Sequence, residues 1–406
     1  MFSIQKRNSS VDRVLLETDL KLAFNSCRTC FISFLENNMD RILILAFNRS
    51  ETKISQKALQ IILSSRLEII NSILHCETFQ QIPKIILDNV EEPSLKLIGN
   101  FANLLENCIH QFPKMKLQLF MNYLFPYLDH PSVISLFETL ISIAPDQFIK
   151  LNVVEQLKFQ IQTDCLNLNE NFNRINSAFR ILSYALSNER VYTYIVTPSF
   201  LQFAINNLQY SSPLISGSQW NLLSHLVAAD NTEHLKICVS YAIEIIIQHS
   251  TTSETSNSLF TEFSEDSENH NCDFSLTFNK DKVDAIHFLG KILEVQPELA
   301  NEINSEQILN ELFYLFRQFP NHSIGLSEIL NFFKIVFNFG KFQPLLSHFF
   351  LDLNILTIKT CTQRAFLKDF YAYMNKDREF PIYSTFSDID FQNIYELSID
   401  SHEIIC

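Results

Sequence analysis

The sequence predicts an all-α protein, an α-α superhelix assembled from short helix pairs. Three observations lead to this prediction: apolar residues recur with helical spacing, prolines separate the apolar segments, and glycine is scarce. The chain has 406 residues, of which 47% are hydrophobic and 19% charged, with only 5 glycines. Because glycine supplies positive-φ turns and phosphate-binding loops, its scarcity argues against β-rich and nucleotide-binding folds.

Five segments show the i, i+3, i+4, i+7 spacing of an amphipathic helix. No comparable run alternates apolar and polar residues between glycine turns, so we expect no strands. The apolar positions of the five segments are Phe101, Leu104, Leu105, Cys108 and Ile109; Val133, Leu136, Phe137, Leu140 and Ile141; Ala178, Ile181, Leu182, Ala185 and Leu186; Ile286, Leu289, Gly290 and Leu293; and Ile329, Phe333, Val336 and Phe337.

Prolines mark the breaks between helices, because proline fits the first turn or the residues just beyond a helix end. The breaks are expected at Pro83, Pro93, Pro113, Pro145, Pro198, Pro213, Pro297, Pro320 and Pro344. Helix pairs then recur about every 35 to 50 residues, the spacing of HEAT- and armadillo-like solenoids. No strict consensus repeat accompanies this spacing, so a compact all-α domain is the competing interpretation.

One polar segment divides the predicted array. Residues 250–275 contain eleven Ser or Thr and six acidic residues, a composition that cannot bury enough apolar surface to order itself. We therefore predict one helical-repeat domain in two parts, 1–249 and 282–380, separated by an acidic Ser/Thr-rich loop at 250–281 and followed by an acidic tail at 381–406. The loop is expected to be a solvated spacer, and whether it is phosphorylated is left open.

The formal net charge of −14 and the pI near 5.3 bear on the partners. Nucleic acids and anionic membranes both repel an acidic chain, so protein partners are expected instead. The longest uninterrupted apolar run, Ile42 to Phe47, is too short to insert in a bilayer. The start, MFSIQKRNSSVDR, has no apolar segment typical of a secretory signal. The nine cysteines are therefore expected to be reduced, in the cytoplasm or the nucleus.

The sequence offers few candidates for chemistry. Cys27 and Cys30 form a C-x-x-C, but zinc needs a second ligand pair and none follows at suitable spacing. The eleven histidines show no metal-binding spacing, and no phosphate-binding glycine motif occurs. We therefore predict no catalytic residue, no metal ligand and no cofactor.

The stretch from Tyr127 to Pro145, YLDHPSVISLFETLISIAP, contains groups that hydrolases use: Asp129, His130, Ser132 and Glu138. The alternative interpretation is a helix start. Asp129 or His130 precedes a proline that suits the first helical turn, and Ser132 is close enough to contribute to capping. Glu138 would lie on the polar side of a helix that ends before Pro145, and we prefer this interpretation.

A second stretch, Ser216-Gly217-Ser218-Gln219-Trp220, contains a Gly-Ser pair without the G-x-S-x-G of a nucleophile elbow. Ser216 or Ser218 is expected to be a helix N-cap, where its hydroxyl meets a free backbone N–H. Trp220, the single tryptophan, is expected to anchor packing in the first turn.

The order of these segments resembles the SAPS-domain family, regulatory subunits of serine/threonine-protein phosphatase 6. The similar segments are 11–47, 55–74, 91–120, the stretch LDHPSVISLFETLISI, 173–189, 214–227, 283–337 and 344–366. The most specific likeness is to the family's Ser-Gly-Thr/Ser-Gln motif, here Ser216 to Gln219. The chain departs from the family at 129–132, where Asp-His-Pro-Ser replaces a glycine-containing turn.

The resemblance implies a non-enzymatic α-helical scaffold that binds a phosphatase catalytic subunit and directs its substrate choice. Metal ions and chemistry would belong to that partner, and other scaffold or substrate proteins would be further partners. The residues expected to bind a partner are Asp129, His130, Ser132, Ser216, Gly217, Gln219 and Trp220. The alternatives are a HEAT- or armadillo-like adaptor in trafficking or transport and, less favoured, an all-α enzyme.

Overall fold

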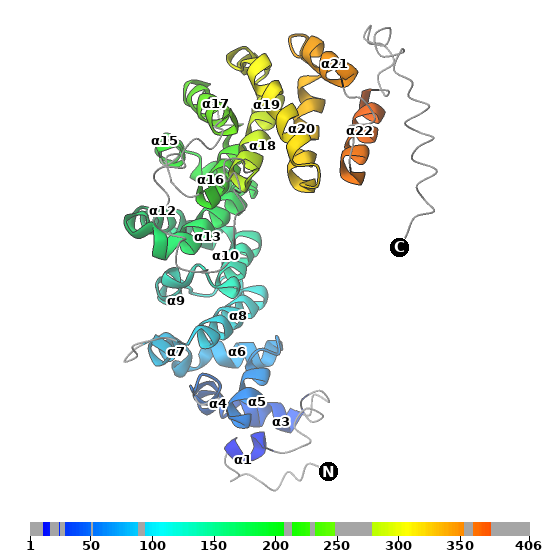
Figure 1. Ribbon diagram of the computed structural model, residues 1–406. Coiled ribbons are helices and arrows are strands. Elements are labelled where there is room, and N and C mark those ends of the chain that lie inside the picture. Colours follow the sequence, from blue (N-terminus) through cyan, green and yellow to red (C-terminus); the bar gives the residue numbers. More distant parts are fainter. Residues whose placement is uncertain are drawn as a thin grey trace, which may run out of the picture. The chain divides into compact units, whose positions relative to one another are not determined.

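A computed structural model describes residues 11–16, 24, 29–49, 52–87, 94–206, 213–227, 232–247, 278–352 and 360–374. Within these ranges every regular element is a helix and none is a strand, which confirms the all-α prediction. The chain divides into two compact units, Met1–Thr197 and Pro198–Cys406, whose helices are labelled in Figure 1.

The N-terminal unit is a succession of short helices joined by tight connections. They are α1 (Val11–Leu15), α3 (Thr29–Glu36), α4 (Met39–Ala46), α5 (Lys53–Ile62), α6 (Leu67–His75), α7 (Glu77–Leu87), α8 (Leu95–Gln111), α9 (Gln118–Leu124), the 3-10 turn η1 (Phe125–Tyr127), α10 (Pro131–Ile143), α11 (Pro145–Lys150), α12 (Val153–Asp164), η2 (Cys165–Asn167), α13 (Leu168–Leu186) and α14 (Glu189–Ile195).

Helices of the N-terminal unit pack against the next helix of the chain, as α4 does on α5 and α12 on α13, and against helices a few elements further on. One row runs through α6, α8, α10 and α13, while α7 contacts α9 and α11 contacts α14. Such packing between successive helix pairs, with contacts only to near neighbours, is the arrangement of helical-repeat solenoids.

The C-terminal unit continues with α15 (Pro198–Asn206), α16 (Pro213–Leu226), α17 (Thr232–Ile247), α18 (Lys280–Val295), η3 (Pro297–Glu302), α19 (Ser305–Gln318), α20 (Ser323–Val336), α21 (Gln343–Asp352) and α22 (Cys361–Met374). It has two layers: α16, α18, α20 and α22 pack in succession in one, and α17, α19 and α21 in the other. The unit is therefore a HEAT- or armadillo-like helical array.

The array is continuous across the acidic segment. Helix α17, before the segment, packs directly against α18, after it, and Lys282 Nζ donates to the Ile246 carbonyl at 3.0 Å. Residues 250–277 of the expected loop and the expected tail at 381–406 lie outside the described residues. The last positions assigned to the loop, Lys280 and Asp281, belong to α18.

The apolar positions that predicted the five amphipathic helices are all buried in α8, α10, α13, α18 and α20 or at the end of α20. Phenylalanine rings connect neighbouring helices of the C-terminal unit: Phe313 of α19 stacks on Phe349 of α21 at 3.4 Å between centroids. Phe316 of α19 meets Phe366 of α22 at 4.8 Å. Ring contacts of this kind add to the area buried between helices.

Most of the proline predictions are confirmed. Pro145, Pro198, Pro213 and Pro297 begin helical elements, Pro344 lies in the first turn of α21, and Pro113 and Pro320 follow α8 and α19; Pro93 lies outside the described residues.

The prediction of a break at Pro83 is wrong, because this residue lies inside α7. Proline costs about 3 kcal/mol in a helix interior. The buried stripe of Phe79, Ile82 and Ile86 continues through it, and burial of such side chains at roughly 1.5 to 3 kcal/mol each outweighs the penalty.

Candidate interaction surface

The structure places the first group of expected site residues at the start of α10. The Nδ1 atom of His130 accepts the backbone N–H of Ser132 at 3.2 Å, so the imidazole caps the helix and the Ser132 hydroxyl does not. Pro131 is the first helical residue, as expected, and α10 ends before Pro145. Asp129 is exposed in the preceding turn, and His130 and Ser132 are half-buried.

These groups do not assemble a hydrolytic site. The Glu138 carboxylate accepts two hydrogen bonds from the Arg180 guanidinium of α13, the shorter at 2.9 Å. The Nδ1 atom of His130 accepts a hydrogen bond from the backbone N–H of Ser132, not from the Ser132 hydroxyl. The helix-start interpretation of this stretch is therefore confirmed.

The second group lies in the interior of α16 and is buried. Ser216 and Ser218 are buried, and Gln219 and Trp220 are fully buried. The N-cap prediction for Ser216 or Ser218 is wrong, because α16 already begins at Pro213 and an N-cap residue precedes the first helical residue. Trp220 is a packing anchor, 5.0 Å from the Phe288 ring between centroids, but in the second turn rather than the first.

This buried stretch is where α16 crosses its neighbours. A Cβ at Gly217 would lie 2.9 Å from Oδ2 of Asp284 and 3.3 Å from Cγ of Lys280, both in α18. Gln219 Nε2 donates to the Ala204 carbonyl of α15 at 2.7 Å. These side chains could meet a partner only if the helices separated, so their partner-binding role stays a prediction.

A half-buried carboxyl group, that of Asp281, lies at the α16–α18 contact. Burial raises the pKa of Asp281 to about 6, although the neighbouring Ser216 hydroxyl and Trp220 indole N–H favour the ionised form and oppose the shift. Burial also raises the pKa of Asp284, against the opposing effect of Lys280. A carboxyl group with a raised pKa thus lies beside the single tryptophan.

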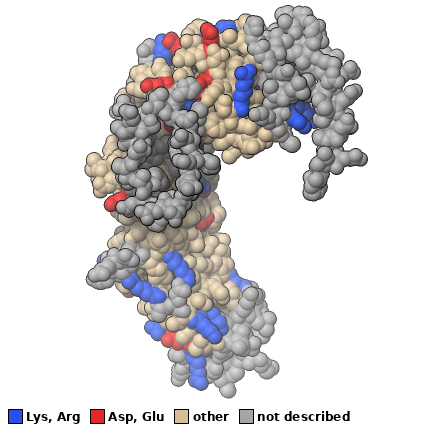
Figure 2. Space-filling model, in the orientation of Figure 1, with Lys and Arg blue, Asp and Glu red and all other residues tan. Residues whose placement is uncertain are grey.

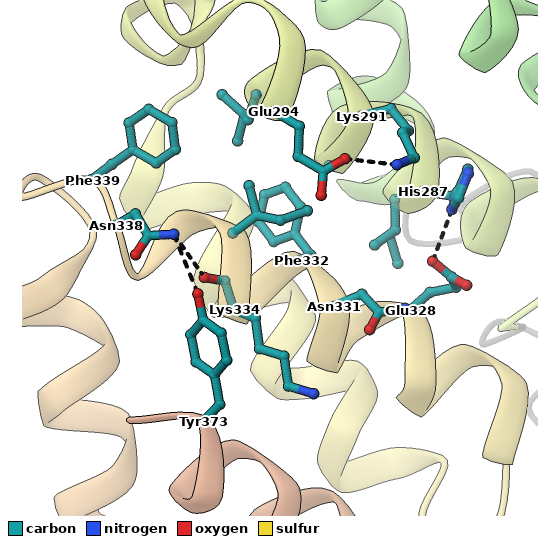
Figure 3. A pocket seen from close by; sticks show the side chains of 14 residues that line it. His287, Lys291, Glu294, Glu328, Asn331, Phe332, Lys334, Asn338, Phe339 and Tyr373 are labelled. Carbon is teal, nitrogen blue, oxygen red and sulfur yellow. Dashed lines mark hydrogen bonds and ion pairs between the residues drawn. The ribbon is translucent and has the colours of Figure 1, made fainter. Parts of the chain in front are cut away.

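The candidate interaction surface is a groove on one layer of the C-terminal unit. It has a volume of about 470 Å³ and is lined by α18, α20 and Tyr373 of α22, as Figure 3 shows. Its floor is set by a close helix crossing, because a Cβ at Gly290 would lie 3.1 Å from Cδ1 of Ile335. The apolar part of the floor includes Phe332 and Phe339.

Polar side chains form the walls of this groove. His287 Nδ1 lies 3.1 Å from Glu328 Oε2 and links α18 to α20, and Lys291 Nζ donates to Glu294 at 2.7 Å within α18. These paired charges stand at the rim of the groove (Figure 3).

The opposite wall is formed around Tyr373. Asn338 Nδ2 donates to the Tyr373 hydroxyl at 3.3 Å, and the Lys334 ammonium lies 5.9 Å from the tyrosine ring centroid. Lys334 of α20 and Asn338, two residues beyond the end of α20, lie beside Tyr373, while Asn331 stands one turn away beside Glu328 (Figure 3). The groove therefore combines an apolar floor, amide side chains and charges of both signs.

The described residues contain no group of three or more His, Cys, Asp or Glu that could hold a metal ion. None of the helices in the described ranges has the length and apolar character needed to cross a membrane.

No family model matches the chain, and no curated protein matches it. Among solved structures, the chain is similar to an engineered protein, with 11% identity, a TM-score of 0.43, and coverage of 96% of this chain and 97% of the other. It is also similar to the karyopherin Kap121p, in complexes with Pho4p and with the SUMO protease Ulp1p, at 11% and 12% identity. In both cases the TM-score is 0.41 and the match covers 92% of this chain and 42% of the karyopherin chain. Likeness of this degree identifies no partner and no activity.

Three groove residues, Ile286, Gly290 and Leu293, were expected as apolar positions of a helix, but none of the polar residues of the groove was predicted. The sequence does contain a pattern that could have indicated them, because polar residues recur at helical spacing in both segments. His287, Lys291 and Glu294 follow i, i+4, i+7, and Glu328, Asn331 and Asn338 follow i, i+3, i+10. The two stripes form one groove only because α18 packs on α20, and spacing within each helix does not reveal that contact.

Proposed function

We propose that this chain is a non-catalytic protein-interaction scaffold whose α18–α20–α22 groove holds an extended segment of a partner protein. The observation that carries the proposal is the lining of the groove: two asparagine amides above an apolar floor, with paired charges at the rim. The Asn331 amide offers both a donor and an acceptor, the two groups that every residue of an extended backbone presents. Asn338 offers its amide oxygen, since its Nδ2 donates to the Tyr373 hydroxyl and the Lys334 carbonyl.

The spacing of the amides supports an extended ligand. Asn331 lies in α20 and Asn338 lies two residues beyond its last residue, Val336, and the seven positions between them correspond to about 10 Å at the rise of a helix. Three residues of extended chain cover about the same distance, at roughly 3.3 Å each. The apolar floor near Phe332 and Phe339 would receive a side chain of the same segment, and the rim charges would favour partners of complementary charge pattern.

The groove residues have no arrangement typical of catalysis. The carboxylate of Glu328 is paired with His287, and no serine, threonine or cysteine lines the groove with them. A nucleophile within hydrogen-bond reach of a base is the minimum for covalent catalysis. A binding surface is therefore the better account of this group of side chains.

A second, finer candidate function is that of a scaffold for a PP6-type serine/threonine phosphatase catalytic subunit. The observation that favours it is the ordered resemblance of residues 11–370 to SAPS-domain proteins, with Ser216 to Gln219 as its most specific part. In this proposal the catalytic subunit supplies the metal ions and the chemistry. The helical array supplies an extended surface large enough for a standard interface of about 800 Å² per partner.

The experiment that tests the groove compares the tagged full chain with the variant Asn331→Ala/Asn338→Ala by affinity purification and quantitative mass spectrometry. The control is Asn301→Ala/Asn321→Ala, which makes the same change at exposed positions of the same unit outside the groove. We expect a set of proteins that is retained by the wild type and the control and depleted by the groove variant. Retention of the same proteins by all three would contradict the role of the groove.

The phosphatase proposal is tested in the same purification and then with purified components. We expect a phosphatase catalytic chain among the retained proteins and a stoichiometric complex on mixing. If the retained proteins include no phosphatase, the phosphatase proposal is wrong, but the general scaffold proposal is unaffected.

A further inference from the structure

A second groove lies in the N-terminal unit, independent of the proposed binding groove. It has a volume of about 650 Å³ and lies between the end of α6, the start of α7, and the connection from α8 to α9. Helices α6 and α8 contact each other, as do α7 and α9, so the groove is open between two packed helix pairs. We call it the α6–α9 groove.

The α6–α9 groove has an apolar floor and flexible apolar side chains at its edges. The rings of Phe79 and Phe120 lie 4.8 Å apart between centroids at its base. Leu119 stands at the edge with 58% of its surface exposed, and Met115 is half-buried beside it. A flexible methionine beside aromatic rings can repack around apolar side chains of different shape, as promiscuous helix- and peptide-binding surfaces do.

The charges around this floor are of one sign. Among the lining residues, Lys114 and Lys116 carry positive charge, His75 is titratable, and none is Asp or Glu. Both lysines are exposed, and neither has a carboxylate partner among the described ion pairs. His75 donates its Nδ1–H to the Asn71 carbonyl at 2.7 Å.

This basic rim contrasts with the charge of the whole chain. Residues 1–197 contain 19 Lys or Arg and 19 Asp or Glu, so the entire net charge of −14 belongs to residues 198–406. Figure 2 shows basic side chains grouped on the visible surface of the N-terminal unit, with few acidic ones between them. An apolar groove with an unpaired cationic rim is complementary to an anionic ligand that also carries apolar groups.

We propose that the α6–α9 groove binds a short acidic segment of a partner protein, with large apolar side chains on the Phe79–Phe120 floor and carboxylates at Lys114 and Lys116. Nucleic acid is the weaker fit, because two lysines neutralise few phosphates. An anionic membrane is also a weaker fit, since recognition of its surface takes clusters of roughly four to eight basic residues.

The test is a selection of random 16-residue peptides, displayed on phage, against the immobilised full-length chain. We expect the enriched peptides to combine Asp or Glu with Leu, Ile, Phe or Trp. The same peptides should not be enriched when the selection is repeated against the variants Lys114→Glu/Lys116→Glu and Leu119→Asp. All changed positions are exposed, and circular dichroism and thermal unfolding will show that the variants are folded.

The matched control is Lys53→Glu/Arg190→Glu, which makes the same change in net charge at exposed positions of α5 and α14. The strongest enriched peptide is then synthesised and measured by fluorescence anisotropy. We expect the Lys114→Glu/Lys116→Glu variant to bind it roughly tenfold more weakly, because two attractions become repulsions, and the control to bind it as the wild type does. Enriched peptides without an acidic bias, or equal binding by both charge variants, would overturn the proposal without affecting the α18–α20–α22 groove.

Discussion

The imidazole of His130 fills the space beside Gly99 where any other residue would place its β-carbon. A Cβ at Gly99 would lie 2.4 Å from Cε1 of His130, and Nδ1 of the same ring accepts the backbone N–H of Ser132. One side chain therefore both caps α10 and fixes how closely α8 and α10 approach. This relationship gives the first prediction.

Gly99→Ala is expected to destabilise the N-terminal unit by about 1 to 3 kcal/mol, because the ring must move and overpacking strains both helices. Urea denaturation followed by circular dichroism measures the change. The control is Gly340→Ala, where no heavy atom lies within 4 Å of the new Cβ and the stability should be unchanged or raised by about 0.5 kcal/mol.

A double-mutant cycle separates the steric clash at Gly99 from the loss of the helix cap that His130 provides. His130→Ala alone should cost about 1 kcal/mol, the value of an N-cap. The double variant Gly99→Ala/His130→Ala should then cost less than the sum of the single variants, because removing the ring removes the clash. Simple additivity would contradict the proposed contact.

Arg174→Ala is expected to destabilise the N-terminal unit by about 3 kcal/mol. Arg174 of α13 makes two hydrogen bonds to Asp164, whose side chain is only 4% exposed. Removing it leaves a buried carboxylate without its counter-ion, held only by the neutral Gln160 amide at 2.9 Å. The matched control is Arg180→Ala, which removes the partner of Glu138. Arg180 is 63% exposed, so this change should cost less than about 1 kcal/mol. If urea denaturation shows a similar loss of unfolding free energy for Arg174→Ala and Arg180→Ala, the prediction is contradicted.

Asp281 is expected to make the C-terminal unit less stable as the pH rises. Burial raises its pKa from the usual 3.8 to about 6 in the folded chain, so the folded state holds this proton more tightly than the unfolded state. The resulting stabilisation is fully present below about pH 4 and is lost as the pH rises through 6. Asp281→Asn should therefore be more stable than the wild type at pH 7.5, by on the order of 2 kcal/mol, and show no such gain at pH 4.

The fluorescence of Trp220 offers a direct measurement of this titration. Trp220 is the single tryptophan, is fully buried and lies beside Asp281. Its emission should change with a midpoint near pH 6 in the wild type and remain flat in Asp281→Asn. An identical titration in both proteins would assign the change to another group.

The cysteines are expected to differ sharply in reactivity. Burial raises the pKa of Cys108 and Cys238 to about 12 and that of Cys76 to about 11, whereas Cys30 is exposed. At pH 8, iodoacetamide should alkylate Cys30 in the native chain and spare the other three, because the thiolate is the reactive form. Peptide mass spectrometry measures the labelling, with the urea-denatured chain as the control in which all four react. Equal labelling of Cys108 and Cys30 in the native chain would contradict this expectation.

Only part of the candidate site could be predicted from the sequence. The start of α10 could be predicted, because Pro131 and its neighbours form a local signal that adjacent residues determine. The burial of Trp220 was expected, but that of Ser216 to Gln219 could not be predicted, since these residues fit an exposed helix cap as well as a helix crossing. The crossing with α18 depends on residues 280–284, more than sixty positions away, and no local pattern specifies which helix covers another.

The sequence by itself determined that the chain is helical, where several helices begin or end at a proline, and which face is buried in the five helices with clear amphipathic spacing. These properties follow from the 3.6-residue period and from proline, both of which act within a few residues. Only the tertiary structure decided that α18 packs on α20, that His287 meets Glu328, and that unpaired lysines surround the α6–α9 groove. Those arrangements depend on the angle and register between helices, which the side chains of several elements fix together.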